Sequence, residues 1–127
     1  MNSQQVVVWI DHREARIFGV DADELEVTTS QAPQHHVHRH PKGATAEHHH
    51  PDDARHYFQD VARALEGTQK ILIVGPSTAK LQFVRFLHEH ARSLEPHVVG
   101  LETVDHPTDA QLAAYAKRYF GLPDRQR

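Results

Sequence analysis

The first thirty residues consist of short apolar runs separated by polar turns, a pattern that predicts three strands. The run Val6–Ile10 is continuously apolar and mostly β-branched, which is typical of a central strand buried on both faces. Residues 14–20 and 24–29 instead alternate apolar and polar side chains, as strands with one wet face do. Short polar links at 11–13 and 21–23 would join the three strands in an antiparallel meander.

From residue 51 onward, helical spacing of apolar residues alternates with two further apolar strands. Proline and aspartates at 51–53 suit a helix start, and Gly67 suits its end. Buried strands are predicted at 71–74 and from Val98 to Leu101, each followed by a helix. The second helix should be capped by Ser77 or Thr78 and the third by a capping box of Thr108 and Gln111, with Gly121 at its end. The apolar faces expected to be buried are Ala54, Tyr57, Phe58, Val61, Ala62 and Leu65 in the first helix; Leu81, Phe83, Val84, Phe86, Leu87, Ala91 and Leu94 in the second; and Leu112, Tyr115, Ala116, Tyr119 and Phe120 in the third.

The resulting order is β-β-β-α-β-α-β-α, which predicts an α/β protein with a mixed sheet of about five strands. Parallel strands should lie at the centre of this sheet, with helices covering both faces. A chain of 127 residues without an internal repeat suits a single domain, residues 1–127.

Composition excludes several kinds of site. The chain has no cysteine, so disulfides, thiolate zinc sites and cysteine nucleophiles are excluded. Its apolar runs are too short for a membrane span or a signal peptide, which leads us to expect a cytoplasmic protein. The formal charge is −3 with neutral histidines and would become +10 if all thirteen were protonated. Net charge therefore does not indicate constitutive nucleic-acid binding at neutral pH.

Residues 31–50 lose all apolar periodicity, and we expect them to form a long loop, of the kind that is functional or disordered. Seven of the thirteen histidines lie in this His-rich segment: His35, His36, His38, His40, His48, His49 and His50.

Taken together, the element order and several short motifs resemble a known family. Val8–Asp11 followed by Ala15–Gly19 resembles the opening hairpin of the middle domain of archaeal and eukaryotic class I peptide-release factors and Pelota. Ile71–Pro76 followed by Lys80 is similar to the strand and glycine turn after the long helix of that domain. Glu102–Asp105 matches the end of its last strand. The chain also looks like small bacterial proteins grouped with translational machinery components, and the resemblance implies a ribonuclease H-like fold.

The resemblance places the His-rich segment where release factors carry the loop that enters the peptidyl-transferase centre. Those factors need Gly-Gly-Gln there, whereas this chain has Gly43 alone, and Gln34 lacks flanking glycines. We therefore expect a translation-associated protein that binds the ribosome, rRNA or tRNA without peptide-release activity. Arg39 and Lys42 carry fixed charge, and imidazoles bond phosphates or stack on unpaired bases. The expected RNA-binding residues are His35, His36, His38, Arg39, His40, Lys42 and Gly43.

A transition-metal site in the same segment is the alternative. In an extended chain, histidines spaced by two residues project to one side and can chelate Zn²⁺ or Ni²⁺. The candidate ligands are His36, His38, His40, His48, His49 and His50, with Glu47 as a further donor. A solvated segment that binds metal adventitiously, as a purification tag does, also remains open.

Three weaker hypotheses concern the carboxyl ends of the predicted strands. A metal-dependent nuclease would use Asp11 with Asp105 or Asp109, although Asp11 is more simply a turn residue. The turn at 75–78 is placed to bind phosphate, although a structural turn with a helix cap is the simpler interpretation. A small polar cluster would be formed there by Asp11, His12, Asp105 and His106, although turn and cap roles are the simpler interpretation.

Overall fold

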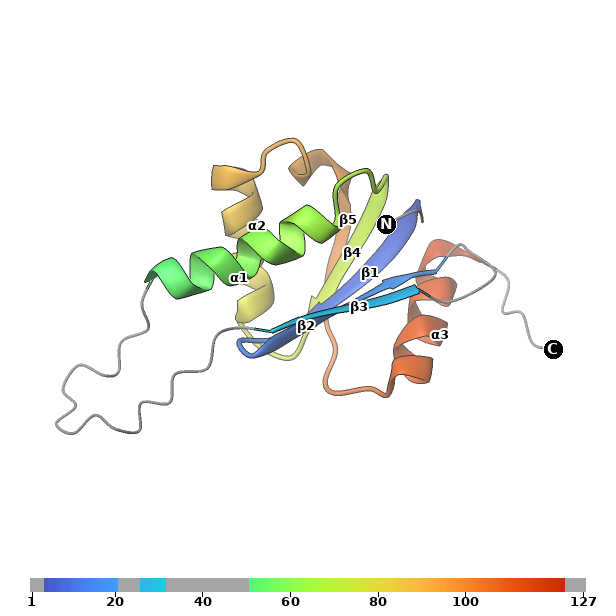
Figure 1. Cartoon of the computed structure of the whole chain (residues 1–127). Coiled ribbons are helices and arrows are strands. Elements are labelled where there is room, and N and C mark those ends of the chain that lie inside the picture. The colour runs from blue at the N-terminus through green and yellow to red at the C-terminus, as the bar shows by residue number, and fades with distance from the viewer. Residues whose placement is uncertain (1–3, 21–25, 32–50, 123–127) are drawn as a thin grey trace, which may run out of the picture.

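The computed structural model describes residues 4–20, 26–31 and 51–122 of the chain, and it contains the predicted order of strands and helices (Figure 1). Most of the predicted segment 31–50 therefore lies outside the described residues, as does the expected turn at 21–23. The elements are β1 (Gln5–Ile10), β2 (Glu14–Gly19), β3 (Glu26–Gln31), α1 (Pro51–Ala64), β4 (Lys70–Gly75), α2 (Ala79–His90), the 3₁₀ turn η3 (Glu95–His97), β5 (Val98–Thr103) and α3 (Asp109–Phe120).

The strands form one mixed five-stranded sheet in the order β3-β2-β1-β4-β5, so the predicted α/β fold is confirmed. β1 lies at the centre, antiparallel to β2 with Trp9 opposite Arg16. On its other side β1 runs parallel to β4, with Val8 opposite Ile73. β3 is antiparallel to β2, and β5 is parallel to β4. The meander and the parallel pairing follow from short turns on one side and helical crossovers on the other.

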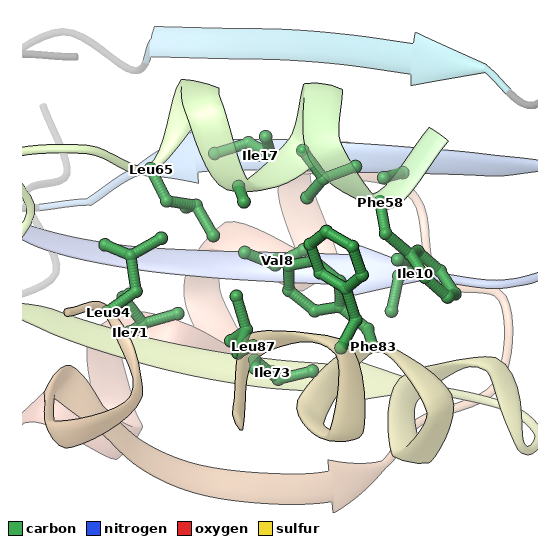
Figure 2. Packing of buried hydrophobic residues seen from close by; sticks show 14 of the residues in the cluster. Val8, Ile10, Ile17, Phe58, Leu65, Ile71, Ile73, Phe83, Leu87 and Leu94 are labelled. Carbon is green, nitrogen blue, oxygen red and sulfur yellow. The ribbon is translucent and has the colours of Figure 1, made fainter. Parts of the chain in front are cut away.

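Helices cover both faces of the sheet, which explains why β1 is apolar at successive positions. Val6, Val8 and Ile10 face α1 and α2, whereas Val7 and Trp9 face α3. Figure 2 shows the first of these faces, where side chains of α1 and α2 meet those of β1 and β4. Aromatic rings fill the contact between the two helices: the ring centroid of Phe58 lies 5.5 Å from that of Phe83 and 5.7 Å from that of Phe86. Such tilted pairs add to the stabilisation from apolar burial.

Four sequence-based expectations of burial are wrong, and one of them is Tyr119 of α3, which is 40% exposed. β5, predicted as a buried strand, is an edge strand, and Val99 and Leu101 are 44% and 39% exposed. Leu81 is 51% exposed because it lies on the side of α2 opposite Phe83, and Ala54 is exposed as well. Spacing alone marks apolar positions but cannot tell which of them have a neighbouring element to pack against.

The helix ends follow the predicted chemistry in α1 and α3 but not in α2. Thr108 and Gln111 form the expected capping box at the start of α3, and Gly121 ends the helix with a φ of 73°. Gly67 has a φ of 88° in the turn after α1, a conformation that favours glycine. Thr78 occupies the N-cap position of α2, yet its side chain accepts no hydrogen bond from the helix, so the predicted side-chain cap is wrong. Within the described ranges, no helix combines the length and apolarity that crossing a lipid bilayer requires.

Candidate functional site at the carboxyl edge of the sheet

Four strands end at the same edge of the sheet, which we call the carboxyl edge. β4 and β5 run parallel to β1. β3 has the same direction, because β2 is antiparallel both to β1 and to β3. The connections that leave this edge are residues 11–13, 32–50, 76–78 and 104–108. Open α/β sheets bind ligands at such an edge, so the polar side chains here form the candidate site.

Three of the four residues predicted to cluster at this edge do so around Trp9. The indole Nε1 of Trp9 donates to the main-chain oxygen of Asp105 at 2.7 Å, and its ring centroid lies 5.2 Å from that of His106. His106 Nδ1 is 2.9 Å from Asp105 Oδ1, and its Nε2 is 3.9 Å from Asp11 Oδ2. His12 is exposed and, within the described residues, forms no hydrogen bond or ion pair with the other three. The β5–α3 connection is thus tied to the end of β1.

Arg16 completes this cluster and was not identified from the sequence. Its guanidinium carbon lies 4.6 Å from the centre of the Trp9 ring, and its Nη1 donates to Asp109 Oδ1 at 2.6 Å. Nη1 and Nη2 also approach the carbonyl oxygen of Pro107, each at 3.4 Å. The predicted hairpin could have revealed this contact, because a turn at residues 11–13 pairs Arg16 with Trp9 on the neighbouring strand.

The turn after β1 is held by its own aspartate and by α1. Asp11 Oδ1 accepts hydrogen bonds from the amides of Arg13 and Glu14, at 2.8 and 2.9 Å. Tyr57 on α1 donates its hydroxyl proton to the main-chain oxygen of Asp11 at 2.9 Å. Burial, followed by the negative charges of Asp11 and Glu14, raises the pKa of Tyr57 far above its ordinary value of 10.0. Tyr57 therefore remains a neutral hydrogen-bond donor that anchors α1 to this edge.

The carboxylates proposed for a nuclease are engaged in other contacts. Asp11 accepts turn amides, Asp109 pairs with Arg16, and Asp105 pairs with His106. Glu102 Oε1 accepts from the hydroxyl of Tyr115 at 3.3 Å. Among the residues that the structure describes, no group of three or more histidines and carboxylates is arranged to hold a metal ion. The described carboxylates thus lack the convergence that two-metal phosphodiester cleavage needs.

The β4–α2 turn packs directly against the end of β1. A Cβ atom on Gly75 would collide with the carbonyl oxygen of Ile10, so only glycine permits this approach. Lys80, one turn further on, is 7% exposed and donates its Nζ to the carbonyl oxygen of Ser77 at 2.7 Å. A buried lysine at this turn was not expected from the sequence.

The structure describes histidines outside the His-rich segment but none inside it. On α2, His88 and His90 are exposed, together with Arg85 and Glu89. All of the expected RNA-binding and metal-binding residues lie outside the described residues: His35, His36, His38, Arg39, His40, Lys42, Gly43, Glu47, His48, His49 and His50.

Comparisons with known proteins identify the fold. No family model matches the chain, and no curated protein sequence matches it significantly. Among solved structures, it is similar to Pelota from Archaeoglobus fulgidus (TM-score 0.63, 17% identity) over 90% of this chain and 30% of that one. Pelota from Thermoplasma acidophilum is also similar (TM-score 0.61, 21% identity), and the match covers 91% of this chain and 31% of that protein. For an archaeal translation termination factor (TM-score 0.56, 15% identity), the match covers 91% of this chain and 38% of that protein.

These likenesses confirm the resemblance predicted from the sequence at the level of the fold. The chain spans about a third of the length of each of these proteins, and it shares about a sixth to a fifth of their residues over the matched part.

Proposed function

We propose that this chain is a translation-associated, cytoplasmic protein that binds the ribosome, ribosomal RNA or tRNA through its His-rich segment and does not release peptides. One observation carries the proposal: the segment joins β3 to α1 at the carboxyl edge of a fold shared with a translation termination factor. A long polar connection on a rigid sheet is a common location for binding residues.

The described residues on either side of the segment support this role. Gln31, the last residue of β3, is paired with Glu14 beside the β1–β2 turn. On the other side, Tyr57 fixes α1 to Asp11 of the same turn. Both flanks of the segment are therefore attached to one rigid part of the sheet, which limits the conformational entropy lost when a partner is bound.

The residues of the segment suit RNA better than ester hydrolysis. Arg39 and Lys42 supply permanent charge for phosphates, and the imidazoles supply donors and flat surfaces for unpaired bases. Gly43 is the single glycine of the segment and has no glutamine beside it. The backbone freedom and the glutamine on which release factors rely are both missing, so we infer contact without peptide release.

Sedimentation of lysate through a sucrose cushion at low and moderate salt tests the proposal. The protein should co-migrate with ribosomal particles at low salt and dissociate as salt rises, because phosphate contacts weaken with ionic strength. Replacing His35, His36, His38 and His40 with alanine should reduce the bound fraction several-fold.

A matched control removes four histidines outside the segment, His12, His56, His88 and His90, all of which are exposed. This variant should sediment like the original protein. Absence of co-migration at every salt concentration, or equal losses in both variants, would contradict the proposal.

A further inference from the structure

Lys80 is a buried lysine with no counter-ion among the described side chains. It is 7% exposed, and its ammonium donates to the carbonyl oxygen of Ser77 at 2.7 Å. Across residues 4–20 and 54–122, no carboxylate lies within ion-pair distance of it. An ammonium carries three donors and no acceptor, and a buried charge is normally paired with one of opposite sign. Among the described residues, the Lys80 ammonium therefore has donors left over for an anion.

The start of α2 adds further unused donors at the same place. Leu81 and Gln82 donate their amides to the Thr78 carbonyl, but the amides of Ala79 and Lys80 have no acceptor among the described residues. The Thr78 side chain does not cap the helix, and the first turn of α2 has no acidic residue. The helix dipole makes this end partly positive, so it adds to the field of the lysine.

The turn that precedes α2 is open on its outer side. Ser77 and Thr78 are exposed, and their hydroxyls take part in no hydrogen bond within the described part of the chain. The hydrogen bond from Lys80 to Ser77 holds the ammonium against this turn. Main-chain amides, hydroxyls and a cation are thus gathered at one turn, as oxyanion binding requires.

We propose that the turn Gly75–Thr78, together with the amide of Ala79 and the ammonium of Lys80, binds a phosphate group. A tetrahedral phosphate offers several oxygens to donors that converge from different directions, and its charge would pair with the Lys80 ammonium. The phosphate belongs either to an RNA backbone or to a free phosphate or small phosphate ester. None of these residues lies in the His-rich segment, so the site goes beyond the proposed function and does not depend on it.

Amide chemical shifts of the ¹⁵N-labelled full chain, titrated with inorganic phosphate at ionic strength held constant with chloride, test the site. The Ala79 and Lys80 amides should shift saturably in the original protein. Lys80→Met keeps the apolar stem but removes the charge, so it should bind phosphate about tenfold more weakly, which corresponds to one lost charge-assisted bond. Lys70→Met, at an exposed lysine at the other end of β4, should bind normally.

Folding of the variant is checked separately in phosphate-free buffer. Lys80→Met should unfold at a midpoint at least as high as that of the original protein, because it no longer buries an unpaired charge. If the variant failed to fold, the titration of the original protein would still decide: saturable shifts at Ala79 and Lys80 support the site, and their absence overturns it.

A second titration with a short single-stranded RNA identifies the source of the phosphate. Shifts of the same amides by RNA, lost in Lys80→Met, assign the site to an RNA backbone. Shifts by inorganic phosphate alone assign it to a free phosphate or small ester. Equal phosphate affinity in Lys80→Met and the original protein would overturn the proposal. Phosphate binding by a protein that never sediments with ribosomes would retain this site while removing the proposed function.

Discussion

At the scale of single residues, the carboxyl edge is held by long side chains that donate to main-chain oxygens of distant segments. Trp9 donates to Asp105, 96 positions away, and Tyr57 donates to Asp11, 46 positions away. The sequence does not reveal these two acceptors, because they are main-chain oxygens and every residue carries one. The apolar surroundings of both donors were predictable from spacing, but the acceptors became known only from the folded chain.

Removing the Tyr57 hydroxyl should alter stability in a pH-dependent way. Tyr57→Phe loses the bond to Asp11 and should lower the free energy of unfolding by about 1 kcal/mol at neutral pH. The pKa of Tyr57 is raised in the folded protein, so the original protein should lose stability as the pH rises above 10.0, where the unfolded chain releases this proton more readily. Urea unfolding between pH 8 and pH 11 should show a weaker alkaline loss in the variant.

Asp11→Asn is the matched comparison for this prediction. It keeps the main-chain acceptor and a side-chain oxygen for the turn amides but removes one of the negative charges near Tyr57. Because burial is the largest cause of the raised pKa, most of the alkaline loss should remain. A complete disappearance of that loss in Asp11→Asn would show that charge, and not burial, controls this tyrosine.

At the scale of elements, two helix starts with similar sequences have different structures. Thr108 precedes α3 and forms a reciprocal pair with Gln111: its Oγ1 accepts the Gln111 amide at 3.1 Å, and its own amide donates to Gln111 Oε1 at 3.0 Å. Thr78 precedes α2 and makes no such contact. The backbone of each threonine explains the difference: Thr108 is extended (φ −69°, ψ 166°), as a capping residue is, whereas Thr78 already has helical angles (φ −82°, ψ −9°). Leu81 also has no side-chain oxygen with which to return a bond to Thr78.

Replacing each threonine by alanine should therefore have unequal effects. Thr108→Ala should lower the free energy of unfolding by about 1 kcal/mol, the usual cost of losing an N-cap. Thr78→Ala should cost less than half of that in phosphate-free buffer, since no capping bond is lost. Urea unfolding of both variants provides the measurement, and equal costs would mean that Thr78 caps α2 in solution.

At the scale of the whole molecule, the core of the described fold is built from apolar side chains. Apolar clusters on both sheet faces account for its core, and the described residues contain no group of three or more metal-binding side chains. A structural metal supplies folding free energy only where its ligands belong to the folded core. Treatment with EDTA should consequently leave the thermal unfolding midpoint unchanged within about 1 °C, a shift well below 1 kcal/mol for a chain of this size.

Differential scanning calorimetry before and after chelation provides this measurement, and zinc titration provides the complementary one. Weak binding of several zinc ions would fit histidines that bind metal as a purification tag does. A chelator-induced fall in the midpoint, or tight stoichiometric zinc binding, would instead favour the transition-metal alternative for the His-rich segment.

The sequence by itself determined the order of the elements, the central position of β1, the capping box of α3 and the likeness to release factors and Pelota. Each depends on local spacing or on the sequential order of motifs, which the chain displays directly. Only the tertiary structure placed β5 at an open edge, brought Arg16 and His106 onto Trp9, and buried Lys80 away from every described carboxylate. These features depend on which segments become neighbours in space, and burial and charge pairing are properties of that neighbourhood and not of the residue alone.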